Sequence, residues 1–64
     1  MAGDHVRVVV IDDHDLFRGG LVQLLEERGI EVLGQAGLAA DGIRQVCDLN
    51  PDVALMDLTM PGMS

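Results

Sequence analysis

Three aspartates in this chain stand where a carboxylate can bind a metal ion or act as a nucleophile. Asp12 and Asp13 follow the apolar run 8–11, and Asp57 follows a second apolar run, 53–56. Short apolar runs that end in acids are typical of buried parallel strands, and ligands bind beside the carboxyl ends of such strands. If the two strands are neighbours, the three carboxylates meet at one edge of the sheet. Because like charges repel, the pattern predicts a divalent cation among them.

Each of these residues also has a simpler interpretation. An Asp-Asp pair after a strand is by itself more often a turn and a helix cap than a metal site, and Asp57 at the end of a second apolar run shifts the balance toward the metal. His14 is expected to face solvent or to take part in the turn rather than to act as a ligand. Cys47 is expected to pack as a small residue in the core of a helix. Arg18 is expected to be a surface charge.

The elements that position the acids alternate along the chain. Apolar spacing predicts strands over 6–11, 30–36 and 53–57 and helices over 16–28 and 41–49. Asp13 or Asp15 can cap the first helix, and Gly29 is a suitable residue to follow its end. The order strand, helix, strand, helix, strand with short links predicts right-handed crossovers, and hence an α/β fold with a parallel sheet.

Charge and composition exclude several classes of function. The chain of 64 residues carries eleven acidic residues against four arginines and no lysine, a formal net charge of -7, which disfavours a nucleic-acid-binding surface. One cysteine excludes an intrachain disulfide and fits a reducing compartment. The apolar runs are far shorter than the roughly 20 residues of a membrane helix, and the N-terminus lacks the layout of a secretory signal. We therefore expect a cytoplasmic protein with no membrane contact.

Two segments resemble one known family. Residues 8–18, Val-Val-Val-Ile-Asp-Asp-His-Asp-Leu-Phe-Arg, resemble the opening of a bacterial two-component response-regulator receiver domain, and residues 51–63 resemble the segment around its phosphorylated aspartate. The segment from His14 to Leu21 resembles the subfamily with a LuxR/NarL-type helix-turn-helix output domain. The resemblance covers nearly all of this chain and about half of the family's receiver domain. It implies a flavodoxin-like (CheY-like) parallel sheet, truncated to three strands and two helices, with strand order 2-1-3.

The resemblance also implies roles for individual residues. Asp57 matches the phosphoacceptor, a nucleophile toward the phosphohistidine of a sensor histidine kinase. The expected Mg²⁺ ligands are the carboxylates of Asp12, Asp13 and Asp57 and the backbone carbonyl of Thr59. Such a module is a signalling switch and not an enzyme. It would regulate transcription, with DNA contacted only by an output domain absent from residues 1–64.

The chain also departs from the family pattern. It reaches Ser64 before the family's hydroxyl residue after the fourth strand and lysine after the fifth. We therefore expect residues 1–64 to carry the nucleophile and metal ligands without being competent for phosphorylation. One alternative is a fragment without chemistry that self-associates, by domain swapping or edge pairing, because its third strand would be a bare edge. Another is a hydrolase resembling phosphatases with an aspartate nucleophile. Those place a second acid two residues after the nucleophile, where this chain has Thr59.

Overall fold

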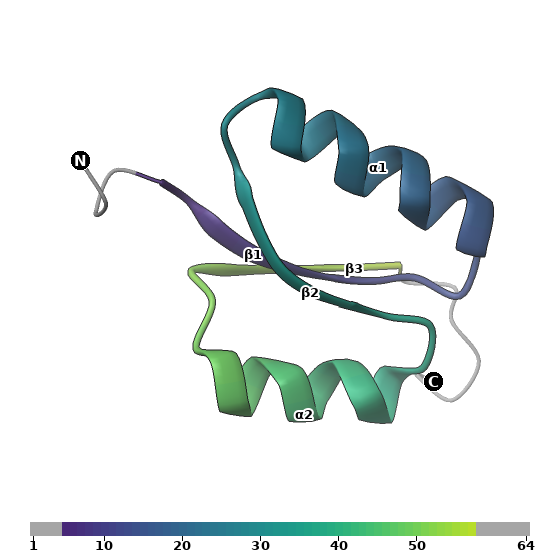
Figure 1. The fold of residues 1–64 in the computed structure, drawn as a ribbon. Helices are drawn as coiled ribbons and strands as arrows, with labels where there is room; N and C mark the ends of the chain where they lie inside the picture. The colour runs from purple at the N-terminus through teal and green to yellow at the C-terminus, as the bar shows by residue number, and fades with distance from the viewer. Residues whose placement is uncertain (1–4, 58–64) are drawn as a thin grey trace.

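The computed structural model describes residues 5–57, which form a three-stranded parallel sheet with one helix on each face (Figure 1). All five predicted elements are present, and the predicted strand order 2-1-3 is confirmed as β2-β1-β3. In chain order the elements are β1 (Arg7–Ile11), α1 (Asp15–Glu27), β2 (Glu31–Ala36), α2 (Ala39–Leu49) and β3 (Val53–Met56).

The helix starts differ most from the prediction. Helix α1 begins at Asp15 with His14 as its N-cap, and α2 begins at Ala39 with Leu38 as its N-cap. Neither cap residue makes a side-chain capping bond, so the prediction that Asp13 or Asp15 caps the first helix is wrong. Asp15 instead lies in the first turn, where a carboxylate favourably meets the positive end of the helix dipole. The apolar Leu38 is not a preferred capping residue, so the sequence does not mark the start of α2.

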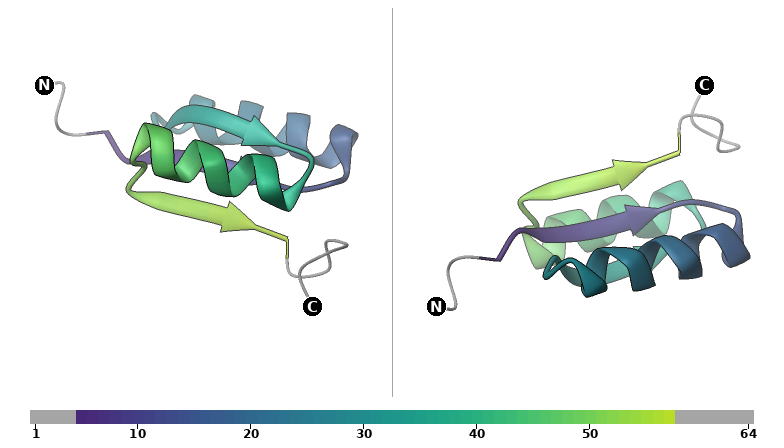
Figure 2. Two further views of the ribbon diagram at one scale, coloured as in Figure 1. Left: turned by 90° about the horizontal axis from the view of Figure 1, so that it is seen from below. Right: turned by 90° about the horizontal axis from the view of Figure 1, so that it is seen from above.

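Strand β1 lies between the two other strands and holds the core (Figure 2). It pairs in parallel with both neighbours, so that Ile11 lies opposite Ala36 on one side and Met56 on the other. Residues 8–11 of β1 are at most 3% exposed. Burial on both faces explains why this strand reads as a continuous apolar run rather than an alternating one. The strand therefore delivers its next residue, Asp12, to the middle of the carboxyl edge.

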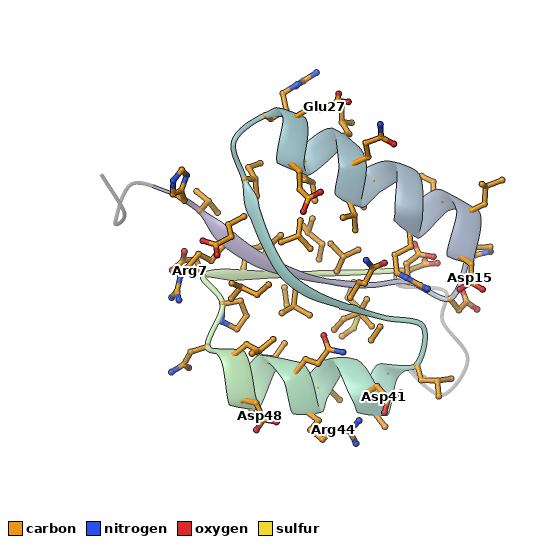
Figure 3. All side chains as sticks on the ribbon, in the orientation of Figure 1. Arg7, Asp15, Glu27, Asp41, Arg44 and Asp48 are labelled. Atoms are coloured by element: carbon orange, nitrogen blue, oxygen red, sulfur yellow. The ribbon has the colours of Figure 1, made fainter. Side chains whose placement is uncertain are left out.

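At Gly42, helix α2 lies so close to β1 that a larger side chain would not fit. A Cβ atom added at Gly42 would lie 2.5 Å from the Ile11 side chain, which is itself 1% exposed. On the opposite face, α1 has no buried residue, and its Leu16 and Phe17 are exposed. The outer face of α2 carries charges that point away from the sheet, among them the ion pair of Asp41 and Arg44 (Figure 3).

Candidate functional site

The loop after β1 and the residue after β3 meet at the carboxyl edge of the sheet. The Asp12 amide donates to the Ala36 carbonyl at 3.0 Å, and the Asp57 amide donates to the Ile11 carbonyl at 3.0 Å. The two amides thus extend the hydrogen-bond ladder by one bond beyond the end of β1 and by one bond beyond the end of β3. This regular backbone carries both side chains to the same edge, as the spacing of the two apolar runs predicts.

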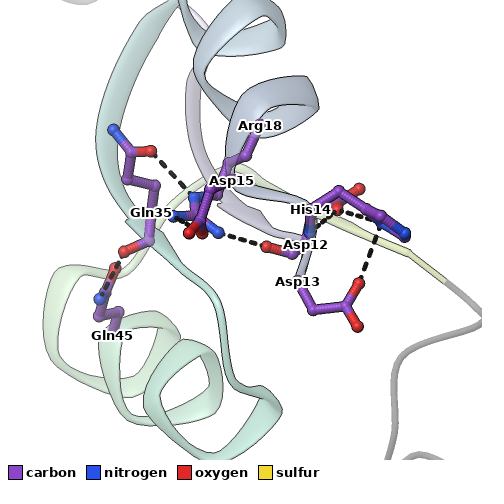
Figure 4. Close-up of polar contacts among 7 residues, drawn as sticks. All are labelled: Asp12, Asp13, His14, Asp15, Arg18, Gln35 and Gln45. Carbon is purple, nitrogen blue, oxygen red and sulfur yellow. Dashed lines mark hydrogen bonds and ion pairs between the residues drawn. The ribbon is translucent and has the colours of Figure 1, made fainter.

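Four side chains converge there. The His14 Nδ1 atom lies 3.1 Å from Asp12 Oδ1, 3.0 Å from Asp13 Oδ1 and 3.5 Å from Asp57 Oδ2. One ligand atom from each of the four residues lies within 4.8 Å of every other, close enough for all to reach one metal ion. Figure 4 shows Asp12, Asp13 and His14 around the turn that leads into α1. The sequence pattern predicted that the three aspartates meet, whereas it left His14 out of the cluster.

Burial differs sharply within this cluster. The side chain of Asp12 is 9% exposed, that of Asp57 18% and that of Asp13 32%, whereas His14 is 65% exposed. His14 is thus the most exposed member of the cluster, and the expectation that it faces solvent is correct. A hydrogen bond with the Asp12 carboxylate and the charge of Asp13 raise the pKa of His14 above its usual value of 6.5. Both interactions stabilise the cationic form of the imidazole relative to the neutral form.

Arg18 holds the loop beneath the cluster in place, and the expectation that it is a surface charge is wrong. Its side chain is only 16% exposed. The guanidinium donates to the Asp12 carbonyl, to Asp15 Oδ1 at 2.8 Å and to Gln35 Oε1 at 3.1 Å. It thereby connects α1 to the loop after β1 and to the end of β2 (Figure 4). The spacing of Asp15 and Arg18 by three residues, a neighbouring pair on a helix, was the available signal.

An apolar groove of about 670 Å³ borders the cluster between α1 and the sheet. Its walls come from β1, α1 and β3, and Asp12, His14 and Asp57 are among the residues that line it. The apolar lining residues are Val10, Ile11, Phe17, Leu21, Leu55 and Met56. Apolar surroundings lower the local dielectric constant and strengthen both repulsion between carboxylates and their attraction to a cation.

Two further predictions concern Thr59 and Cys47. Thr59, the expected fourth metal ligand through its carbonyl, lies outside the described residues. Cys47 is exposed, so its assignment to the helix core is wrong. Helix α2 turns Gly42 and Val46 toward the core, and Cys47 lies about 100° further around the helix.

Comparison with known proteins identifies the family. Residues 8–64 match the family described as the response regulator receiver domain. This chain belongs to that family. It is 49% identical over 59 residues to the transcriptional regulatory protein LiaR of Bacillus subtilis, and 44% identical over 59 residues to the response regulator GacA of Pseudomonas aeruginosa. Each alignment covers 91% of this chain and 28% of the relative.

A solved structure supports the same assignment. The signal receiver domain of NarL from Mycobacterium tuberculosis superposes with a TM-score of 0.85 and 46% sequence identity, over 91% of this chain and 48% of that chain. The receiver fold implied by the sequence motifs is thus confirmed. The chain spans under a third of the length of the curated relatives and about half of the NarL receiver. Between residues 5 and 57, neither helix has the length and apolar character needed to span a bilayer.

Proposed function

We propose that Asp57 is the phosphoacceptor of a two-component response regulator and that Asp12 and Asp13 help to hold the Mg²⁺ ion required there. The observation that carries this proposal is the convergence of these three carboxylates at the carboxyl edge of a β2-β1-β3 receiver sheet. A nucleophile on a regular strand end is held rigidly, and phosphoryl transfer depends mainly on positioning and charge neutralisation.

The proposed reaction follows from the chemistry of the carboxylate. An oxygen of Asp57 attacks the phosphorus of a phosphohistidine on a sensor histidine kinase. The P–N bond breaks, its electron pair returns to the kinase imidazole, and Asp57 becomes an acyl phosphate. The 18% exposure of the Asp57 side chain leaves it open to a donor while its backbone stays fixed to Ile11.

The residues present fit Mg²⁺. This ion takes oxygen ligands in an octahedral shell and keeps several waters, so three carboxylates and one carbonyl satisfy it. Asp12, Asp13 and Asp57 supply the carboxylates, and we assign the carbonyl to Thr59. The bound ion would neutralise charge on the phosphoryl oxygens. The same cation would offset the repulsion among the three aspartates.

The signalling partners follow from the same role. We propose that a sensor histidine kinase in the cytoplasm supplies the phosphoryl group. An output domain outside residues 1–64 would carry the signal to DNA and so regulate transcription. The net charge of -7 supports this division of roles, because a negative charge disfavours binding of the receiver itself to nucleic acid.

Metal binding and phosphodonor labelling together test the proposal. The chain should bind Mg²⁺ in calorimetry, and any phosphoryl group that acetyl phosphate adds in the presence of Mg²⁺ should be removed by hydroxylamine. Asp57→Asn should abolish the label, whereas Asp52→Asn should leave it unchanged. We expect the label on residues 1–64 to be close to absent, because this chain contains no lysine and Arg18 is already bonded to Asp15. Mg²⁺ binding is therefore the first measurement and labelling the second. Absence of both Mg²⁺ binding and label would contradict the proposed role of Asp57.

Self-association is a second candidate function, favoured by the exposed side of β3. Among the described residues β3 pairs only with β1, and its first residue, Val53, is 43% exposed beside the open end of the sheet. A second copy of the chain could pair with this edge through backbone hydrogen bonds. Light scattering with and without Mg²⁺ tests this: a dimer supports edge pairing or swapping, and a monomer at all concentrations contradicts it.

A further inference from the structure

The position of the His14 imidazole relative to the carboxylates suits a metal ligand. Ligand atoms 2.0–2.1 Å from an octahedral ion lie about 3.0 Å from their nearest neighbours. The His14 Nδ1 atom lies 3.0 Å from Asp13 Oδ1, 3.1 Å from Asp12 Oδ1 and 3.5 Å from Asp57 Oδ2. Its spacing from the first two oxygens is therefore that of adjacent positions in one coordination shell.

The backbone holds the ring in this region. The His14 amide donates to Asp12 Oδ1 at 2.7 Å, and the His14 carbonyl accepts from the Arg18 amide at 2.8 Å as the N-cap of α1. Both bonds fix the Cα atom, so that reaching the ion requires only rotation of the side chain. Because the ring is 65% exposed, that rotation displaces no core residue.

We propose that His14 supplies a nitrogen ligand to the metal site and so shifts its selectivity from Mg²⁺ toward borderline first-row ions such as Ni²⁺ and Co²⁺. The inference rests on the metal site proposed above at Asp12, Asp13 and Asp57. Imidazole is a good ligand for these ions, whereas Mg²⁺ prefers oxygen and retains its waters. An added nitrogen therefore strengthens Ni²⁺ and Co²⁺ binding and contributes little to that of Mg²⁺.

The alternative to direct ligation is that the His14 imidazole competes with the metal ion. If the imidazole acts only as a hydrogen-bonding partner of the carboxylates, it occupies the space of the ion and competes with every metal. Removal of His14 would then tighten binding of Mg²⁺, Ni²⁺ and Co²⁺ alike. Direct ligation instead predicts a loss of affinity confined to the ions that favour nitrogen.

Calorimetry on the 64-residue chain separates direct ligation by His14 from competition by His14 with the metal ion. A pH of about 8 favours the neutral imidazole, which is the form that binds metal. His14→Gln should lower the affinity for Ni²⁺ and Co²⁺ at least about tenfold and change that for Mg²⁺ less than about threefold. The matched control is His5→Gln, since His5 lies near the Gly29 carbonyl at the opposite edge of the sheet. It should leave all affinities unchanged. In wild type, Ni²⁺ should also produce large paramagnetic shifts of the His14 ring protons.

An equal change for all three ions, or tighter binding after His14→Gln, would overturn the role of His14 as a ligand. Failure of this inference is distinguishable from failure of the proposed function. Mg²⁺ binding that disappears in Asp57→Asn, together with Ni²⁺ and Co²⁺ affinities that do not change in His14→Gln, would keep the receiver site and remove only the nitrogen ligand. Circular dichroism of each variant confirms that the fold is retained.

Discussion

Charged side chains are arranged differently at the carboxyl and amino edges of the sheet. At the carboxyl edge of the described structure, three carboxylates gather around one imidazole. At the amino edge, Arg7 faces Asp52: the Arg7 amide donates to Asp52 Oδ2 at 2.9 Å, and its guanidinium lies 3.6 Å from the same oxygen. The guanidinium also donates to the Asn50 carbonyl at 3.0 Å. In Figure 3 the labels of Arg7 and Asp15 mark these opposite ends.

The two edges differ in whether their charges are balanced within the described structure. At the amino edge one arginine, Arg7, pairs with one aspartate, Asp52, so the charges balance without a bound ion. The same contacts hold the turn before β3. The carboxyl edge collects like charges on rigid strand ends, which costs stability unless a cation binds. A protein keeps such a cost where function requires it, as strained and repelling groups cluster at functional sites.

Saturation with Mg²⁺ should produce the largest effect and should depend on one edge only. At a free concentration of 100 times the dissociation constant, binding to the native state alone adds about 2.7 kcal/mol to the free energy of unfolding. Thermal unfolding followed by circular dichroism should show this gain in wild type and in Asp52→Asn. The comparison of the two edges would fail if Asp52→Asn removed the gain as fully as Asp57→Asn does.

Removal of a single carboxylate at the carboxyl edge should weaken Mg²⁺ binding more than any change at the amino edge. Asp13→Asn replaces a charged ligand by a neutral amide, and we expect the affinity to fall at least about tenfold. Asp52→Asn makes the same chemical change at the amino edge and should alter the affinity less than about twofold. Titration calorimetry measures both; equal losses in the two variants would show that general charge, and not the cluster, binds the ion.

Without metal, the same kind of change should have opposite effects on stability at the two edges. Asp57→Asn relieves repulsion with Asp12 and Asp13, so the melting temperature in EDTA should rise by a few degrees. Arg7→Gln removes the partner of Asp52 and should lower it slightly, because exposed pairs contribute little. A melting temperature that falls on Asp57→Asn would contradict the view that this edge is destabilised by its own charges.

The smallest effects concern pH. A raised pKa of His14, due to the hydrogen bond with Asp12 and the charge of Asp13, contributes stability that is fully present below pH 6.5 and is lost as pH rises through the folded-state pKa. A lowered pKa of Asp52, due to the hydrogen bond from the Arg7 amide, contributes stability present above pH 3.8 that is lost as pH falls through the folded-state pKa.

Melting curves in EDTA across this pH range measure the two contributions separately. His14→Gln should remove the loss on the alkaline side, and Asp52→Asn should remove the loss on the acid side. If His14→Gln removed the loss on the acid side, or Asp52→Asn the loss on the alkaline side, His14 and Asp52 would not be the groups that titrate.

The sequence alone determined the order of the elements, the parallel sheet and the edge at which Asp12, Asp13 and Asp57 meet. These features follow from local properties. Continuous apolar runs specify strands buried on both faces, helical spacing specifies the crossovers, and an acid directly after a strand must lie at its carboxyl end. The motifs around Asp12 and Asp57 were also sufficient to indicate the receiver family, because each combines a strand with the acid that follows it.

The tertiary structure alone decided how individual side chains face one another. It placed Arg18 in the interior of a hydrogen-bond network and Cys47 on the surface. It also set Gly42 against Ile11 and directed His14 toward all three carboxylates. Each outcome depends on the rotation of a helix about its axis, or on a turn that brings residues distant in sequence together. Apolar spacing specifies which face of a helix is buried only within about one residue, and one residue is a rotation of about 100°.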